Sequence, residues 1–208
     1  WVPFSRYIFN TVLVSVAGTA GHLFLASLAA YALAKIKFPG RDLMFQTVQM
    51  SLMFNATVTA ITSFILMSAL HWLDTYWALI VPAWCSSLGL YLMKQFMDTN
   101  VNDSVLESAR LDGAKELKIF WVIAMPMVKP AWLTLIIYSF QGLWNAGASM
   151  YIYSEQYKSF NYAIGQILAG GIKRAGASAA SLVIMMLVPI IIFIISQFEY
   201  IPIRSSAC

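Results

Sequence analysis

The chain has 208 residues, of which 60% are hydrophobic and only 11% are charged, and its mean hydropathy is +0.72. Soluble domains carry about 25% charged residues, so this composition excludes an ordinary soluble protein and predicts a membrane protein. The net charge of +4 does not indicate nucleic-acid binding, because the basic residues lie between apolar stretches, as in loops that flank membrane spans. The two cysteines, Cys85 and Cys208, match no disulfide, redox or metal-site spacing.

Charged residues divide the chain into five apolar stretches, each close to the roughly 20 residues that a helix needs to cross a bilayer. In chain order they are residues 9–34, residues 43–62 with an outer segment to His71, residues 76–96, a stretch between Lys129 and Glu155 that begins earlier at Trp121, and residues 177–198. The pattern predicts an all-α, polytopic bundle with five spanning helices, in a single domain over residues 1–208.

The basic residues orient these helices, because loops on the cytoplasmic side are enriched in lysine and arginine. Nine basic residues lie in the links 35–41 and 94–129 and in the tail, against four on the other side. This orientation places Trp1 outside the cytoplasm, although no signal peptide or methionine precedes it. We therefore expect an upstream spanning helix in the full chain, which would then have six.

The predicted spans contain almost no ionisable residue, although such residues usually mark ion pathways in membrane carriers. His22 is the one deep candidate, and a neutral, hydrogen-bonded packing residue is the simpler reading. The chain also lacks a phosphate-binding glycine loop. A transporter with neither an ion relay nor a nucleotide site needs an energised partner.

The most informative segment is residues 101–130. Ser104 followed by Glu107 forms a capping-box pattern that predicts a helix from about residue 105. Gly113 then permits a sharp bend, and Asp112 is placed to cap a second short helix over about residues 114–120. Two short amphipathic helices joined at a bend are suited to docking into a groove on another protein.

This segment resembles the cytoplasmic signature of binding-protein-dependent ABC importer permeases. The signature has Glu-Ala-Ala, a glycine four residues later and an Ile-x-Leu-Pro ending; the matching residues here are Glu107-Ser108-Ala109, Gly113 and Ile123-Ala124-Met125-Pro126. Only Ser108 and Met125 depart from the pattern, and both changes are small.

The resemblance implies that a loop at about residues 98–120 is the coupling loop, which docks into an ATPase subunit. The residues expected to carry this role are Glu107, Ser108, Ala109, Asp112, Gly113, Ala114, Phe120 and Pro126. It also implies a non-catalytic subunit in a bacterial-type inner membrane that binds no cofactor or metal itself, ATP and Mg²⁺ being held by the ATPase. The expected partners are ATPase subunits, a second and different permease, an extracellular solute-binding protein and lipid, with no nucleic acid.

Two further segments resemble the carbohydrate branch of the family: Tyr31–Lys35 with Phe38–Arg41, and Gly142–Asn145. Ala146 stands where many sugar permeases have aspartate. The function expected is uptake of a sugar or sugar-like solute; amino acids, peptides or metal chelates are the alternative cargo, and a non-transporting assembly subunit is the alternative role. A membrane enzyme is disfavoured because only two histidines, His22 and His71, are present and neither has suitable neighbours.

A neutral solute needs hydrogen-bonding groups and aromatic faces along its path. The candidates are Asn55, Thr59, Tyr138, Gln141, Trp144 and Asn145, although Trp and Tyr also anchor helices at membrane interfaces. Pro126 and Pro130 mark either a pivot or an interfacial entry to the fourth span. The outer segment 157–176, with Lys158, Lys173 and Arg174, is expected to meet a binding protein.

Overall fold

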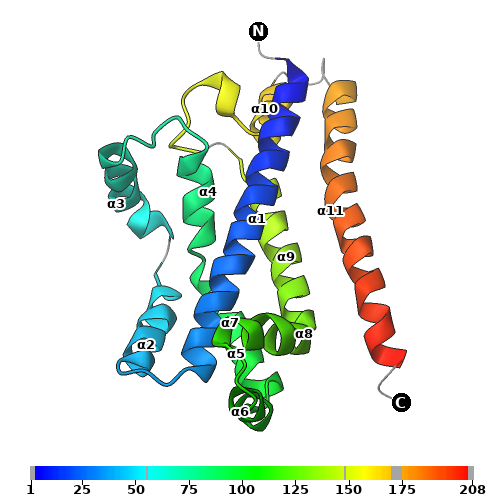
Figure 1. The fold of residues 1–208 in the computed structure, drawn as a ribbon. Helices are drawn as coiled ribbons and strands as arrows, with labels where there is room; N and C mark the ends of the chain where they lie inside the picture. Colours follow the sequence, from blue (N-terminus) through cyan, green and yellow to red (C-terminus); the bar gives the residue numbers. More distant parts are fainter. Residues whose placement is uncertain (1–2, 55, 148, 170–174, 206–208) are drawn as a thin grey trace. The chain divides into compact units, whose positions relative to one another are not determined.

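The computed structural model describes residues 3–54, 56–147, 149–169 and 175–205. These residues form helices connected by short loops, and the described ranges contain no β-strand. Figure 1 shows the helices in chain order. Their bounds are α1 Phe4–Lys35, α2 Arg41–Ser51, α3 Ala56–Ala69, α4 Trp77–Trp84, α5 Ser87–Asn100, α6 Asp103–Leu111, α7 Glu116–Ile119, the π-helix η1 Phe120–Ala124, α8 Met125–Met127, α9 Lys129–Trp144, the 3₁₀-helix η2 Glu155–Tyr157, α10 Phe160–Ala169 and α11 Ala175–Ser205.

The all-helical prediction is confirmed, but five unbroken spanning helices are not observed. Within the described residues, two helices are long and apolar enough to cross a membrane, namely α1 and the stretch Gly176–Ile194 of α11. A third candidate exists if Glu116–Met127 and Lys129–Trp144 count as one span, although the two parts meet at a bend of 82°. The first and last predicted helices are thus confirmed with longer bounds, and the other three stretches are each divided.

The predicted single helix over residues 43–62 is wrong because the chain turns after Ser51. The backbone N–H groups of Leu52 and Met53 donate to carbonyls three residues back, so the last turn of α2 tightens and ends. The Ser51 hydroxyl bonds to the Val48 carbonyl at 2.7 Å and lies 2.6 Å from the Ser87 hydroxyl. Such local side-chain bonds compete with the helix ladder.

The predicted helix over residues 76–96 is divided into α4 and α5 at Cys85–Ser86. Pro82 lies inside α4 and removes one backbone donor from it. His22 lies at this break: its Nδ1 is 3.3 Å from the Trp84 carbonyl oxygen, and the residue is only 1% exposed. Because a carbonyl only accepts, Nδ1 carries the proton, and the structure places His22 as a buried packing residue that caps the end of α4.

The fourth predicted stretch bends at Val128, which has φ −103° and ψ 25° between α8 and α9. Pro126 and Pro130 lie on either side of this bend. Pro130 has no N–H to donate to the Pro126 carbonyl four residues back, so the helical hydrogen-bond ladder is interrupted here. The two prolines therefore mark a sharp turn between α8 and α9.

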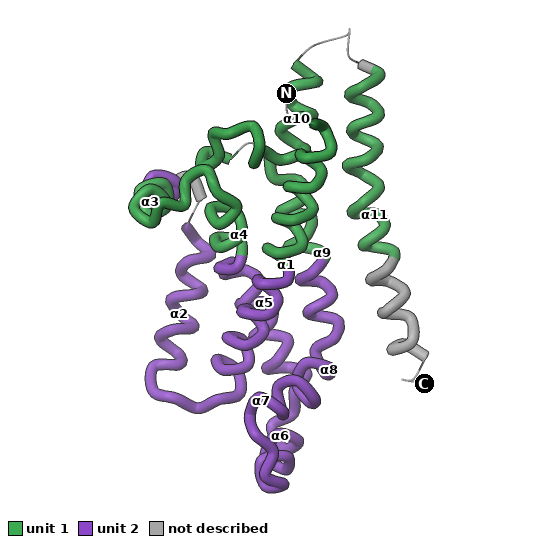
Figure 2. The backbone as a smooth tube through the Cα atoms, turned by 45° about the horizontal axis from the view of Figure 1, so that its top comes forward, with its two compact units in different colours: residues 1–19, 62–83, 137–208 green, residues 20–61, 84–136 purple. Residues whose placement is uncertain are grey.

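The chain divides into two compact units, coloured in Figure 2. Unit 1 contains residues 1–19, 62–83 and 137–208, and unit 2 contains residues 20–61 and 84–136. In unit 1, a cluster of Phe140, Trp144, Phe160, Ile164 and Met185 is buried. In unit 2, a larger buried cluster joins α1, α5, α6, η1 and α9. The assignment of one domain to residues 1–208 stays a prediction.

Candidate functional site

The helix pair α6–α7 occupies the predicted coupling loop, but its first helix begins earlier than the capping box indicates. The N-cap of α6 is Asn102, whose side-chain oxygen accepts from the Ser104 backbone N–H at 3.2 Å. Ser104 therefore lies within the first turn, and its predicted role as the cap is wrong. Asn102 outcompetes it because asparagine is as strong a cap as serine and Asp103 favours the positive end of the helix.

Gly113 forms the bend that the sequence predicts. Its φ of +78° lies in the left-handed region. The Gly113 N–H donates to the Arg110 carbonyl and the Ala114 N–H donates to the Ala109 carbonyl, both at 3.0 Å. This pair of bonds is the Schellman motif, which ends a helix at its C-terminus. The bend is therefore fixed by backbone hydrogen bonds.

The second helix of the pair is shorter than predicted. Helix α7 contains only Glu116–Ile119, and its N-cap is Lys115, which makes no side-chain capping bond. The predicted cap Asp112 instead closes α6 as its C-cap residue. Beyond α7 the chain widens into the π-helix η1, a rare conformation that is often found at functional sites.

The predicted coupling residues divide into an exposed set and an anchoring set. Ala109 and Ala114 are half-buried and pack against the core of unit 2, and Phe120 is 1% exposed within that core. The exposed members are Glu107, Ser108, Asp112, Gly113 and Pro126. Leu111 and Leu117 are also exposed, at 89% and 67%. The helix pair thus presents two large apolar side chains on either side of the Gly113 bend, which is the kind of surface that a partner covers.

A charged cleft of about 320 Å³ lies where this pair meets the end of α1. The Lys35 ammonium bonds to the Asp103 carboxylate at 2.8 Å and to the Val101 carbonyl at 2.7 Å. The hydrogen bond from Lys35, followed by its positive charge, lowers the pKa of Asp103. Arg110 and Glu116 form a second ion pair, with 2.7 Å between Nε and Oε1. The sequence analysis did not predict either ion pair. The available indication was that each of these charged residues lies close to apolar residues in the sequence.

The predicted solute-path residues occupy different environments. Tyr138 and Gln141 are exposed three residues apart on α9, and Asn145 is exposed directly after its last residue. Thr59 is exposed on α3. Trp144 is 1% exposed, and its indole N–H donates to the Met185 carbonyl at 3.0 Å, so it packs within unit 1. Asn55 lies outside the described residues.

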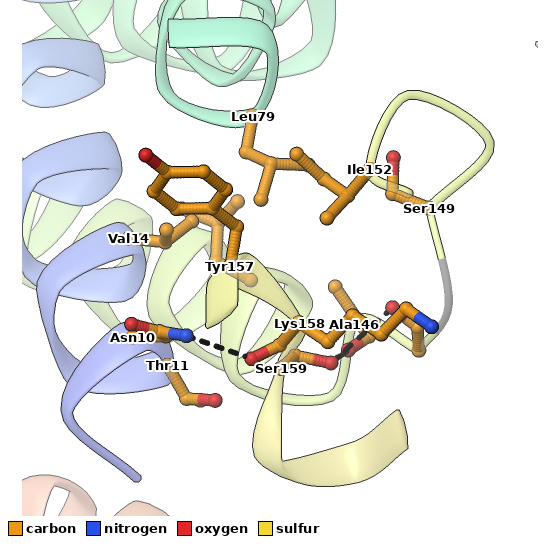
Figure 3. A pocket seen from close by; sticks show the side chains of 12 residues that line it. Asn10, Thr11, Val14, Leu79, Ala146, Ser149, Ile152, Tyr157, Lys158 and Ser159 are labelled. Atoms are coloured by element: carbon orange, nitrogen blue, oxygen red, sulfur yellow. Dashed lines mark hydrogen bonds between the residues drawn. The ribbon is translucent and has the colours of Figure 1, made fainter. Parts of the chain in front are cut away.

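Unit 1 contains a cavity of about 220 Å³, shown in Figure 3. Asn10 lies beside it at 1% exposure. The Asn10 amide donates to the carbonyls of Gln156 and Lys158 at 2.8 and 3.0 Å, and its oxygen accepts from the Tyr76 hydroxyl at 2.8 Å. These bonds satisfy the whole amide and fix the loop before α10 against α1. The lining residues are Asn10, Thr11, Val14, Leu79, Leu143, Ala146, Gly147, Ser149, Ile152, Tyr157, Lys158 and Ser159.

Asp74 is a second organising residue of this loop, and the sequence patterns gave no sign of it. It has a positive φ of 61°, and its N–H donates to the Tyr151 carbonyl at 2.8 Å. Its carboxylate accepts from the N–H groups of Tyr153 and Ser154 and from the Ser154 hydroxyl. The hydrogen bond from the Ser154 hydroxyl is the largest of the effects that lower the pKa of Asp74. One carboxylate therefore holds together two loops that are distant in sequence.

We expect Asp74→Ala to destabilise unit 1 more than Asp74→Asn, because asparagine retains one acceptor oxygen and tolerates positive φ. Loss of hydrogen bonds to a charged acceptor is worth about 1–3 kcal/mol. Since the folded pKa lies below the ordinary value of 3.8, the carboxylate contributes fully above that value and progressively less as the pH falls through the folded pKa. Thermal unfolding across acidic and neutral pH measures this difference. If the difference in unfolding temperature between wild type and Asp74→Asn persisted in acid, the carboxylate charge would not be the source of that difference.

Fold and site together describe an all-helical chain with apolar helices of membrane-spanning length and an exposed, sharply bent helix pair. The family described as "Binding-protein-dependent transport system inner membrane component" matches residues 7–201. The chain belongs to this family, and the resemblance drawn from Glu107, Gly113 and Pro126 is confirmed.

Three relatives show how far the similarity extends. The chain is 34% identical over 150 residues to Protein LplC of Bacillus subtilis, covering 67% of this chain and 50% of LplC. It is 34% identical over 158 residues to the polygalacturonan/rhamnogalacturonan transport system permease protein YtcP of the same organism, covering 71% and 54%. It is 33% identical over 143 residues to the sn-glycerol-3-phosphate transport system permease protein UgpE of Yersinia enterocolitica, covering 69% and 50%. The chain thus spans about half the length of the curated relatives it matches.

A solved structure shares the fold. It is described as the crystal structure of a bacterial ABC transporter involved in the import of the acidic polysaccharide alginate. One of its chains matches with a TM-score of 0.81 and 25% sequence identity, covering 95% of this chain and 75% of the other. The divided helices seen here therefore belong to a fold that a solved transporter chain also has.

Proposed function

We propose that this chain is a permease subunit of an ATP-driven ABC importer and contributes half of the path for a sugar or sugar-like solute. Family membership supports the permease role, and the names of YtcP and UgpE, together with the alginate importer of similar fold, support a carbohydrate-like cargo. The structural observation that carries the proposal is the helix pair α6–α7, closed by the Gly113 Schellman motif and flanked by the exposed Leu111 and Leu117.

In this proposal the helix pair docks on an ATPase subunit, which binds ATP and Mg²⁺ and hydrolyses ATP. The chain itself performs no catalysis. The chain crosses the bacterial inner membrane several times. Two of its spans are each formed by a pair of shorter helices, α2 with α3 and α4 with α5. A second, different permease completes the path, and the loop fixed by Asp74 and Asn10 meets an extracellular solute-binding protein. Closure of the ATPase moves the helix pair and opens the path to the opposite side.

The exposed face of α9 is the proposed contribution to the path. Tyr138 and Gln141 present a hydroxyl and an amide group from α9, and Asn145 presents a second amide directly after its last residue. Polar side chains within a membrane face a water-filled cavity or another helix rather than lipid, so this face lies toward the path or the second permease. Trp144 would act indirectly, by packing α9 against α11.

The test is uptake into proteoliposomes that hold the full-length complex with its binding protein, with and without ATP. The labelled panel contains neutral sugars, acidic oligosaccharides, sugar phosphates, amino acids and peptides. We expect one carbohydrate class to accumulate only with ATP, and Gln141→Ala to change its apparent KM. Gly142→Ala is the matched control, because an added Cβ there meets no atom within 4 Å. Accumulation of amino acids or peptides alone would refute the cargo, and uptake that does not depend on this chain would refute the permease role.

A further inference from the structure

We propose that the helix pair α6–α7 moves as one body with the C-terminal end of α1, held there by a polar clamp formed by Tyr31, Lys35, Asp103, Arg110 and Glu116. The proposal rests on the proposed function, since it identifies α1 as the helix through which the docking surface acts. All five residues belong to unit 2. In Figure 1, α6 and α7 lie beside the end of α1.

The first point of the clamp fixes the start of α6. The Lys35 side chain is only 5% exposed, and an ammonium group removed from water is costly unless it is paired. Its partners are the Val101 carbonyl at the end of α5 and the Asp103 carboxylate at the start of α6. One buried charge at the end of α1 therefore joins three helices.

The second point fixes the start of α7. The Glu116 carboxylate accepts from the Tyr31 hydroxyl at 2.8 Å and from Arg110 Nε at 2.7 Å, with Arg110 Nη2 at 3.4 Å. Tyr31 is 4% exposed, and its ring packs edge-on against Phe120 with 5.4 Å between centroids. The two donors hold the Glu116 carboxylate in one orientation, and each hydrogen bond to it is strengthened by its charge. Removing either donor therefore weakens the attachment of α7 to α1.

The covalent connections of the helix pair are less direct than the clamp. Toward α5 the chain passes through Val101 and Asn102, both in extended conformation. Toward α9 it passes through the π-helix η1 and the bend at Val128. By contrast, the first residues of α6 and α7 bond directly to α1 beside a close-packed apolar core, and such cores transmit displacement rather than absorb it. Movement of the docking surface is therefore carried to α1 through these bonds as well as through the shared core.

The functional test compares Tyr31→Phe, Glu116→Gln and their double variant in the full reconstituted complex. We expect solute imported per ATP hydrolysed to fall about tenfold in each single variant, the factor that corresponds to losing one hydrogen bond to a charged group. The double variant should fall less than the product of the two single effects, because Tyr31→Phe removes one of the hydrogen bonds that the Glu116 charge strengthens. ATP hydrolysis and membrane level should remain. The matched control is Asp98→Asn, which removes an ion pair with Lys94 that lies within α5 alone.

A distance measurement separates failure of the clamp from failure of the proposed function. Spin labels at Lys37, two residues after the end of α1, and at Lys118 on α7 are both exposed and outside the clamp. They report the separation of α7 from the C-terminal end of α1 in the full complex. We expect the same distance with and without ATP in wild type and a broadened distribution in Glu116→Gln. A distance that changes with nucleotide in wild type, or an unchanged import ratio in both single variants, overturns the clamp. If the wild-type complex imports no solute, the proposed function fails, and the clamp is then tested by the spin-label distance alone.

Discussion

Replacing Gly113 with valine is expected to reduce ATP-dependent uptake to background, while the subunit still reaches the membrane. The φ of +78° at this position costs residues other than glycine about 1–2 kcal/mol, and β-branched residues more. A Cβ added to Gly113 meets no atom within 4 Å, so the effect comes from the backbone rather than from a clash within this chain. Valine would open the Schellman motif and displace Leu111 and Leu117 from their arrangement on the docking surface.

Asparagine and aspartate separate the possible causes at Gly113. Both tolerate the left-handed region better than valine does, so Gly113→Asn should retain most uptake. Gly113→Asp adds a charge beside the exposed Asp112 and should be impaired only if the partner's surface disfavours that charge. Uptake in proteoliposomes, normalised to the amount of assembled complex, gives the ranking. Equal loss in the asparagine and valine variants would mean that the partner approaches too closely for any side chain, and the backbone explanation would be wrong.

Replacing Gly89 with alanine is expected to cause the largest loss of stability. A Cβ at Gly89 would overlap the imidazole of His22, with Nε2 as the nearest atom. The ring cannot move freely, because His22 is 1% exposed and its Nδ1–H donates to the Trp84 carbonyl at the break between α4 and α5. Overpacking of this kind costs about 1–3 kcal/mol, and displacing the ring would also break its hydrogen bond to the Trp84 carbonyl. Thermal unfolding of the purified subunit in detergent measures the loss.

A double-mutant cycle with His22 tests the cause. His22→Ala alone should destabilise unit 2, since it removes the capping bond at Trp84 and leaves a cavity. In the His22→Ala background, Gly89→Ala should cost little, giving a coupling free energy of about 1–3 kcal/mol. Gly142→Ala serves as a control for a glycine that has open space around it. Strictly additive effects of His22→Ala and Gly89→Ala would show that the imidazole is not what excludes a side chain at Gly89.

The helix pair shows how much of a site can be predicted from local patterns. The bend at Gly113 and the exposure of Glu107 and Asp112 follow from glycine's backbone freedom and from the charges around it, so the sequence predicts them. The choice of cap for α6 does not follow so simply, because Asn102 and Ser104 are both capable caps and lie two residues apart. Their competition is decided by which residue has extended geometry when α5 and α6 pack together.

The composition by itself determined that this is an all-helical membrane protein, because about 20 successive apolar residues are the direct requirement of crossing a bilayer. The spaced signature from Glu107 to Pro126 determined the family, since its residues specify a local backbone bend at Gly113 and the exposed side chains around it. The tertiary structure decided where the predicted spans break, at Ser51, at Cys85–Ser86 and at Val128, because the hydropathy of these stretches is continuous. It also decided which polar residues meet, as with Lys35 and Asp103 or Asp74 and Ser154. Hydropathy records only whether a side chain prefers to leave water, whereas a hydrogen-bonded partner distant in sequence exists only after the helices have packed.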